Sequence, residues 1–461
     1  MRANPFIRPR AFTIYVLAVA ACTAVAAPTA VAEDGFARPG VDYDPTTLLV
    51  GYNDAETHAA ISARYTDRTK KIGPKSAVVH VPLGTPLAAE ARRIARQPGV
   101  RFVKPNYRLR TSAAFVPNDP GKNSAGGWQQ IQWNFAGTWG VNAPRAWDHV
   151  RNLGAEGGRG VIVAVIDTGV AYERRGIFRR SPDLAGVPIR SSWDFIDHDR
   201  HANDRNGHGT HVASTIVEQT NNGIGVTGLA YGATLMPLRA LDGAGVGDER
   251  TVAKAIRYAA DRRADIINMS VEFDVRLSAR DLPVIVSAMR YARRKGSLVI
   301  GAAGNQGARQ VAYPARSIYA VAVGATTIHG CLADYSDVGN GLDLVAPGGG
   351  ADSGIVDLRR GSTDIQNCNF TGRPAPIYQM TFGRSYRRFG LPSGYEGTSM
   401  ATPHVSATAA LVIASGVLGP DPTPEAVLAR LQSTARDVGY PGFDARYGHG
   451  LVDAAAAVGA P

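Results

Sequence analysis

Cysteine is scarce in this chain of 461 residues, which contains only three: Cys22, Cys331 and Cys368. Cys22 falls in an expected signal segment at the N-terminus, so the exported chain keeps two cysteines and at most one disulfide. An oxidising compartment favours a disulfide between Cys331 and Cys368. Two separate buried thiols are the alternative.

Long apolar runs are absent beyond the N-terminus, so we expect no transmembrane anchor. The N-terminus has three arginines in its first ten residues, an apolar stretch at Phe12–Ala21 and a small-residue cleavage site at Ala30–Ala32. This pattern predicts a signal peptide over residues 1–32 and a secreted protein. The run Val19–Cys22 resembles a bacterial lipoprotein box, so a lipid anchor on Cys22 in the cell envelope is the alternative.

Clusters that combine basic and aromatic residues are also absent, although the net charge is +11. The basic residues occur in short runs, such as Arg179-Arg180 and Arg293-Arg294-Lys295. We therefore expect a solvated basic surface and no nucleic-acid partner. An apolar content of 44% with 19% charged residues is typical of a globular protein with a large core.

Residues 33–115 are predicted to form a small α/β unit. Strand patterns at Leu48–Tyr52, Ala77–Val81 and Val100–Val103 surround an amphipathic helix at Leu87–Arg96. Residues 116–127, which are rich in Gly, Asn, Pro and Ala, are interpreted as a linker.

From residue 128 to residue 461, short apolar strands alternate with helical stretches. Such alternation predicts a three-layer α/β domain, in which helices cover both faces of a parallel sheet. Residues 349–395 show no clear period and are interpreted as an insertion loop. The predicted strands are Val161–Ile166, Asp265–Met269, Leu298–Ala302, Tyr319–Val323 and Leu342–Val345, and the predicted helices are Val212–Val217, Val252–Arg262 and Val284–Arg294.

Three polar residues stand at the ends of predicted elements. Asp167 follows the apolar strand Val161–Ile166, where α/β sheets place their sites, although a turn aspartate is also common there. His208 stands between two glycines ahead of an apolar helix, as a base would, or as half of a metal pair with His211. Ser399 lies in a small-residue turn before another apolar run, where a helix N-terminus would stabilise a developing negative charge.

The order Asp, His, Ser is that of subtilisin. The chain resembles the subtilisin-like serine proteases (peptidase S8) in Asp167–Gly169, in His208–His211 and in Gly397–Ala401. The resemblance extends from about Trp133 to the C-terminus. It implies a secreted serine endopeptidase that acts on proteins or peptides through an acyl-enzyme. Its roles would be a nucleophile (Ser399), a base (His208), an orienting carboxylate (Asp167) and an oxyanion donor (Asn305).

The first unit looks like the inhibitory propeptide of this family, which is similar to a folding chaperone. The resemblance implies a zymogen in which the chain's own propeptide, residues 33–115, is an intramolecular inhibitor. We expect self-cleavage between about Arg110 and Asp119, and we expect the protein to act as a monomer.

The run Thr220–Val226 is similar to the family's calcium loop. The implied ligands are the carboxylate of Asp183, the side chain of Asn222 and the carbonyls of Thr220, Ile224 and Val226, all of them oxygen donors that suit Ca²⁺. Gln129 or Gln130 could add another. A plain Gly-rich loop is the alternative.

The resemblance also places substrate along Ser270, Val271 and Glu272, beside a pocket lined by Ala303, Gly304 and Ala312. The family usually has a small residue at the position of Glu272. A carboxylate there could favour basic side chains over the family's apolar preference.

Two other functions compete with this one. A catalytically silent member used for binding would usually lose one of Asp167, His208, Asn305 and Ser399, and all four are present. A metal-dependent hydrolase built on His208, His211 and His404 would lack a His-Glu-x-x-His helix.

Overall fold

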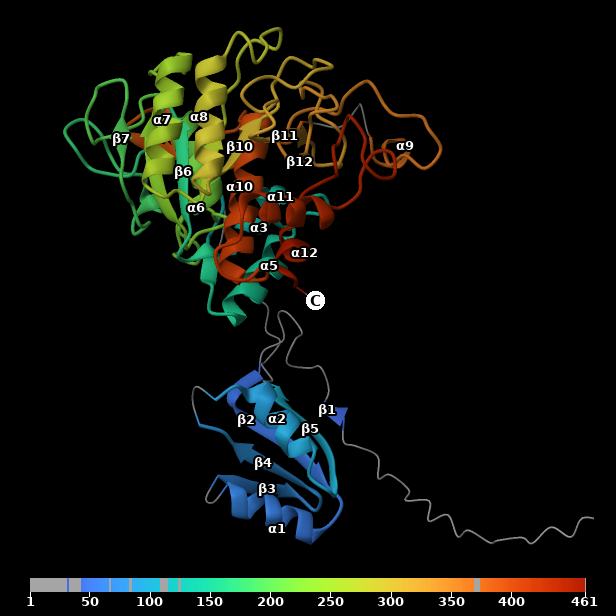
Figure 1. Cartoon of the computed structure of the whole chain (residues 1–461). Coiled ribbons are helices and arrows are strands. Elements are labelled where there is room, and N and C mark those ends of the chain that lie inside the picture. The colour runs from blue at the N-terminus through green and yellow to red at the C-terminus, as the bar shows by residue number, and fades with distance from the viewer. Residues whose placement is uncertain are drawn as a thin grey trace, which may run out of the picture. The chain divides into compact units, whose positions relative to one another are not determined.

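The computed structural model describes residues 31–32, 43–65, 68–82, 85–107, 115–122, 126–368 and 374–460. The chain divides into two compact units, Met1–Arg110 and Thr111–Pro461. The first unit is blue in Figure 1, and the second runs from cyan to red. The expected signal peptide, apart from Val31 and Ala32, and the lipoprotein-like box at Cys22 lie outside the described residues.

The first unit is a five-stranded sheet in the order β1-β5-β2-β4-β3 with two helices. On β2 the alternate residues Leu48, Val50 and Tyr52 are buried. On α2 the buried residues Leu87 and Ile94 share the face that packs on the sheet. Its elements are β1 (Val31–Ala32), β2 (Tyr43–Tyr52), α1 (Ala55–Arg64), β3 (Thr69–Gly73), β4 (Ser76–His80), α2 (Leu87–Ala95) and β5 (Val100–Tyr107).

The second unit is built on a seven-stranded sheet in the order β12-β11-β10-β9-β6-β8-β7, and every neighbouring pair is parallel. The strands are β6 (Ile162–Asp167), β7 (Trp193–Asp194), β8 (Thr234–Arg239), β9 (Ile266–Met269), β10 (Leu298–Ala302), β11 (Val321–Thr326) and β12 (Leu344–Pro347). The helices are α3 (Trp128–Ile131), α4 (Trp133–Ala136), α5 (Ala143–Asn152), α6 (His208–Val217), α7 (Glu249–Asp261), α8 (Pro283–Arg294), α10 (Thr398–Ser415), α11 (Pro424–Ser433) and α12 (Ala454–Val458).

Helices cover both faces of this sheet, which confirms the predicted three-layer fold (Figure 1). Along β6, Val163 and Val165 face the core that contains α6 and α10. Ala164 and Ile166 face the other core, under α7 and α8. Because successive side chains on a strand point to opposite faces, a strand buried on both sides must be apolar throughout. The predicted β6, β9 and β10 are such strands.

The prediction missed β8, whose Pro237 interrupts the strand signal. On its outer side β8 meets the two-residue β7 and a single bridge between Leu235 and Ile189, and Pro237 pairs with neither, so its missing N–H breaks no long ladder. It also missed α1, a largely polar helix capped by Asp54, and β3, an exposed lysine-rich edge strand.

Residues 349–395 contain regular structure that the sequence did not predict. A short helix, α9 (Asp364–Asn367), is followed by a hairpin of β13 (Thr381–Ser385) and β14 (Arg388–Gly390). This segment packs on α6: Ser214 Oγ donates to the carbonyl of Met380 (3.0 Å), and the ring of Tyr395 stacks on that of His211, with centroids 4.2 Å apart. The insertion therefore supports the helix that begins at His208.

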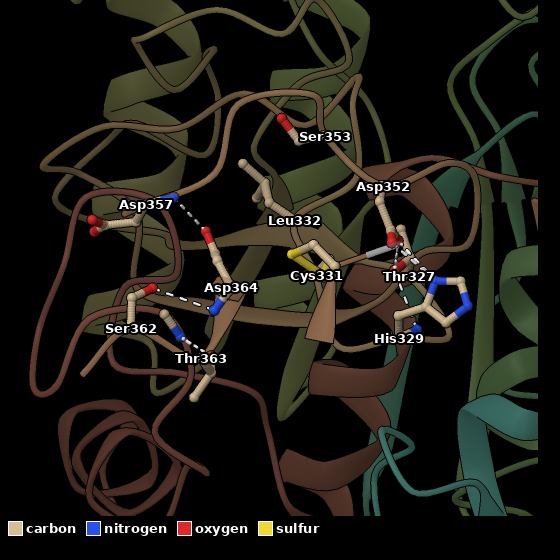
Figure 2. The surroundings of a disulfide bond; sticks show 12 residues. Thr327, His329, Cys331, Leu332, Asp352, Ser353, Asp357, Ser362, Thr363 and Asp364 are labelled. Atoms are coloured by element: carbon tan, nitrogen blue, oxygen red, sulfur yellow. Dashed lines mark hydrogen bonds and ion pairs between the residues drawn. A yellow bond between two sulfur atoms is a disulfide. The ribbon is translucent and has the colours of Figure 1, made fainter. Parts of the chain in front are cut away.

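A disulfide joins Cys331 to Cys368, with their Cα atoms 5.5 Å apart. Figure 2 shows polar contacts on either side of it. On one side Asp352 accepts hydrogen bonds from Thr327, and it lies 3.0 Å from Nδ1 of His329; on the other, Asp364 accepts from the backbone N–H of Asp357 (2.9 Å). The expected disulfide is thus present, and it ties the insertion to the segment after β11.

The described part of the expected linker lies within the second unit. Trp128 donates its indole N–H to the carbonyl of Pro117 (3.0 Å), and Asp119 is buried against the loop at residues 221–223. In the described part of the chain, no helix has the length and apolar character needed to cross a bilayer.

Candidate active site

The strands β8 and β9 lie on opposite sides of β6, so the carboxyl end of β6 is a point where the chain order of the sheet reverses. Ligand sites of open α/β sheets lie at such points. Asp167 is the last residue of β6, and Ser270 follows the end of β9. The topology therefore collects the predicted polar residues at one edge.

Asp167 and His208 are hydrogen-bonded to each other. His208 begins α6, and its Nδ1 lies 2.8 Å from Oδ1 of the fully buried Asp167. The same oxygen accepts the N–H of Thr168 (2.7 Å). Burial alone would lower the pKa of His208, but the charge and hydrogen bond of Asp167 outweigh it, so the pKa is raised above its ordinary value.

Two glycines around His208 permit this close approach. Gly207 has φ +107°, a conformation that favours glycine. A Cβ on Gly209 would lie 2.2 Å from the carbonyl oxygen of Gly169 and 3.0 Å from Oδ1 of Asp167. The glycines of this motif are therefore required by geometry, because a side chain at Gly209 would push the helix away from the carboxylate.

Ser399 is the second residue of α10, after Gly397 with φ +145°. Its hydroxyl donates to the carbonyl of Ser270 (3.1 Å), and the hydroxyl of Ser270 donates to the carbonyl of Ser399 (2.9 Å). This reciprocal pair fixes the start of α10 against the end of β9. The hydroxyl thus stands where the first backbone N–H groups of α10 lack helical partners.

Asn305 follows β10 and faces the same place. Its Oδ1 accepts the N–H (2.8 Å) and the hydroxyl (3.0 Å) of Thr398. Because these bonds orient the amide, its NH₂ group is directed away from Thr398, and Nδ2 donates to Oε2 of Glu272 (3.2 Å).

A cleft of about 460 Å³ joins these residues, and its lining includes His208, Ser270, Val271, Glu272, Asn305 and Ser399. Ala303, Gly304 and Ala312, predicted to line a substrate pocket, are buried and do not line this cleft. A larger cavity of about 960 Å³ exists elsewhere in the second unit, but none of the candidate residues lines it. We therefore take the smaller cleft as the site.

The predicted calcium loop surrounds Asp183. One carboxylate oxygen of Asp183 accepts from Nδ2 of Asn222 (2.7 Å), and the other accepts from the N–H of Val226 (3.0 Å). Within the described residues, no hydrogen-bond donor reaches the carbonyls of Thr220, Ile224 or Val226. Free carbonyls beside a carboxylate form a set of hard oxygen donors, which suits Ca²⁺.

Sequence reasoning missed two acidic residues near this loop. Buried Asp119 accepts the N–H groups of Asn221 (2.8 Å) and Asn222 (3.2 Å). Glu218 is also buried, and its Oε2 has no hydrogen-bond partner. Burial, with the charge of Asp119 adding to it, raises the pKa of Asp183 to about 7. A bound cation would relieve this concentration of buried carboxylates.

Within the described residues, no three His, Cys, Asp or Glu side chains are placed to hold a metal, so a cation here would need the carbonyl and amide oxygens. Gln129 and Gln130 are exposed. It is Gln132 that meets the following residue of the loop, because its Oε1 accepts the N–H of Thr227 (2.9 Å). In the sequence, Asp119 is marked only by its place in the turn-rich run Pro117–Pro120.

The histidines of the alternative metal-hydrolase hypothesis do not converge. His211 is buried, and its Nε2 lies 3.0 Å from the carbonyl of Ile377. His404 is buried inside α10, where its ring contacts Asn134 and the carbonyl of Met400. Both residues are thus core histidines that do not face each other across a site, although Nδ1 of His211 has no hydrogen-bond partner within the described residues.

Comparisons with known proteins agree on one family. Residues 158–450 match the family model described as the subtilase family, Peptidase_S8. The chain is 34% identical to a thermophilic serine proteinase of Bacillus sp. (strain AK1) over 71% of this chain and 67% of that protein. It is 33% identical to thermitase of Thermoactinomyces vulgaris, over 66% of this chain and 87% of the relative.

Subtilisin Savinase of Lederbergia lenta is 34% identical over 71% of this chain and 99% of that protein. A solved protease structure from Pseudoalteromonas arctica is 29% identical, with a TM-score of 0.58 over 75% of this chain and 99% of that chain. The chain therefore belongs to the subtilase family and is a serine endopeptidase.

Proposed function

We propose that Asp167, His208 and Ser399 form the catalytic triad of this endopeptidase. The observation that carries the proposal is the bond between His208 and the buried Asp167, in a cleft that His208 shares with Ser399. An aspartate bonded to Nδ1 leaves Nε2 of the imidazole as the base. The roles are those that the resemblance implies: Ser399 attacks the scissile carbonyl, and His208 takes its proton and returns it to the leaving amine.

The hydroxyl of Ser399 has to turn before it can react. In the free enzyme its proton is directed to the carbonyl of Ser270, not to His208. A rotation about one side-chain bond would bring the proton to the imidazole, and catalytic hydrogen bonds often form only once substrate is bound. Asp167 would then stabilise the imidazolium, because its carboxylate stays buried beside the ring.

The oxyanion of the tetrahedral intermediate would be bound by Asn305 and by the backbone N–H of Ser399, since the N–H of Thr398 already donates to Asn305 and that of Met400 to Gly397. Thr398 holds the Asn305 amide through two hydrogen bonds, which supports a pre-oriented donor. Removing one such donor typically costs about 10²–10³ in kcat.

We also propose that Asp183, Asn222 and the carbonyls of Thr220, Ile224 and Val226 hold a structural Ca²⁺, with Asp119 beside them. When bound, the ion would supply positive charge to buried carboxylates and tie the loop down. It has no role in the reaction, since the loop does not line the cleft.

The chain is further proposed to be secreted and made as a zymogen, with the first unit as its inhibitor. The signal-like N-terminus and the separate compact first unit support this proposal.

Labelling of the secreted protein with a fluorophosphonate probe, which reacts with an activated serine, tests the triad. We expect the wild type to be labelled, Ser399→Ala to be unlabelled and Asp167→Asn to be labelled much more slowly. Ser433→Ala, an exposed serine on α11, is the matched control and should label normally. Labelling that persists in Ser399→Ala would refute the assignment.

A further inference from the structure

The cleft contains one carboxylate and no cation from a basic side chain. Among the described residues that line it, Glu272 is the only acidic side chain, and none is Lys or Arg. Glu272 is exposed to solvent and forms no ion pair within the described part of the chain. A negative charge is therefore presented directly to whatever lies beside Ser399.

Glu272 is also hydrogen-bonded to the Asn305 amide, which is proposed to bind the oxyanion. Its Oε2 accepts the hydrogen bond of Asn305 Nδ2 (3.2 Å), the donor proposed for the oxyanion. While this bond is made, one of the two hydrogens of the Asn305 amide is engaged, and a carboxylate stands next to the place where negative charge has to develop. Like charges in such a position are unfavourable.

A second carboxylate, Asp337, contacts Gly304, the residue before Asn305. Asp337 is fully buried, its N–H donates to the carbonyl of Gly304 (2.9 Å), and a Cβ on Gly304 would lie 2.0 Å from its Oδ2. Its Oδ1 accepts the N–H groups of Gln306 (3.0 Å) and Ala308 (2.7 Å), but its Oδ2 has no hydrogen-bond partner among the residues that the structure describes. Although Glu272 is exposed as a whole, its carboxyl group is partly desolvated, which raises its pKa, and the charge of Asp337 adds to that rise.

We propose that Glu272, aided by the charge of Asp337, makes the cleft beside Ser399 select a positively charged side chain, arginine or lysine, on the acyl side of the scissile bond. The proposal rests on the proposed function of Ser399 and Asn305. An ammonium or guanidinium group would pair with the Glu272 carboxylate, which is otherwise without a cation. The buried Asp337 would add to the negative potential of the pocket without direct contact.

The same pairing would release Asn305. A carboxylate drawn to a substrate cation gives up its bond with the amide, so the engaged hydrogen of Nδ2 becomes available to the oxyanion and the negative charge beside it is neutralised. An uncharged substrate would leave Glu272 on Asn305 and would be cleaved slowly even when bound. Glu272 is thus a specificity residue for the substrate and a positioning residue for Asn305.

Matched peptides that differ only in this side chain test the inference. Arginine, its neutral isostere citrulline, and leucine would be compared on the secreted enzyme, with rates normalised to active sites titrated by fluorophosphonate. We expect the wild type to favour arginine over citrulline in kcat/KM by roughly tenfold or more, as a paired charge would give. Glu272→Gln should abolish this ratio and raise kcat on leucine, whereas Asp274→Asn, whose charge Arg276 already neutralises, should change neither.

Asn305→Ala separates selection from release. In the wild-type background, Asn305→Ala should lower kcat more for arginine peptides than for leucine peptides. In the Glu272→Gln background, it should lower kcat equally for the two peptides. Asp337→Asn should weaken the arginine preference with a smaller effect than Glu272→Gln. A labelled wild type that cleaves arginine and citrulline peptides equally, or a Glu272→Gln enzyme that keeps the preference, overturns this inference alone. An unlabelled wild type refutes the proposed function itself.

Discussion

At the scale of single residues, the site depends on a charged group kept out of water. Asp167 is fully buried, and its Oδ2 has no hydrogen-bond partner within the described part of the chain. Such a carboxylate is costly unless a positive group can face it. His208 faces it, so the proposed triad would stabilise the imidazolium that catalysis forms.

The raised pKa of His208 predicts how activity depends on pH. Only the neutral imidazole can accept the proton of Ser399, so kcat/KM should fall as the pH falls through the pKa of His208. Because Asp167 raises that pKa, the half-maximum should lie above pH 6.5, the ordinary value. A pH profile of kcat/KM measures it, and a half-maximum well below pH 6.5 would contradict the pairing.

Gly209 should tolerate no side chain. Gly209→Ala places a Cβ 2.2 Å from the carbonyl oxygen of Gly169, so α6 has to shift and His208 moves with it. We expect kcat/KM to fall about 10²-fold, as a misplacement of about 1 Å can cause. Gly354→Ala is the control, because an added Cβ there meets nothing within 4 Å. Equal activity of the two variants would show that α6 absorbs the change.

The sequence predicted candidate site residues that stand in short local motifs. It missed residues that reach the site only because the fold brings distant parts of the chain together. Asp167, His208, Asn305 and Ser399 each lie beside small residues whose geometry is local. Asp337 gains its role only because the chain after β11 returns beneath Gly304, 33 residues earlier in the numbering.

At the scale of elements, buried strands were the easiest to predict, because a parallel strand covered on both faces is an uninterrupted apolar run. The hairpin β13–β14 was missed for the opposite reason. Its residues include Arg384, Arg387 and Arg388, and no apolar alternation marks it. Its position comes from contacts with α6, such as the bond from Thr381 Oγ1 to the carbonyl of Gly207 (2.6 Å).

The disulfide should stabilise the insertion more than the site. Replacing both Cys331 and Cys368 by Ala opens a loop of sequence separation 37 and should lower the free energy of unfolding by about 3–4 kcal/mol. Neither cysteine lines the cleft, so kcat/KM of the folded variant should stay near that of the wild type. Thermal unfolding and peptide hydrolysis measure the two effects. A variant with unchanged stability would show that the closed loop contributes nothing.

At the scale of the whole molecule, the calcium loop should contribute to global stability. A calcium chelator should lower the midpoint of thermal unfolding of the mature protein by about 4 °C, as expected for a ligand near 100 times its Kd and a chain of about 350 residues. Asp183→Asn should lose most of this sensitivity, and Asp274→Asn should keep it. The readout is unfolding, so it does not depend on activity. A midpoint that chelation leaves unchanged would favour a plain loop.

Processing should leave residues 115–122 on the second unit. Asn118 and Asp119 are hydrogen-bonded to the loop at 221–223, so cleavage after them would remove buried contacts. We expect the secreted wild type to begin between residues 111 and 115, and Ser399→Ala to keep the first unit. N-terminal sequencing of both proteins decides this. The same new N-terminus in both would mean that another protease does the cutting.

The burial of α10 affects how this enzyme loses activity on heating. This helix carries Ser399 at its first turn, and the residues from Met400 to Val412 are buried on every side. A helix enclosed in this way is expected to open only together with the core around it, so Ser399 should keep its place until the second unit unfolds. Loss of hydrolytic rate on heating then serves as a direct gauge of how many molecules remain intact.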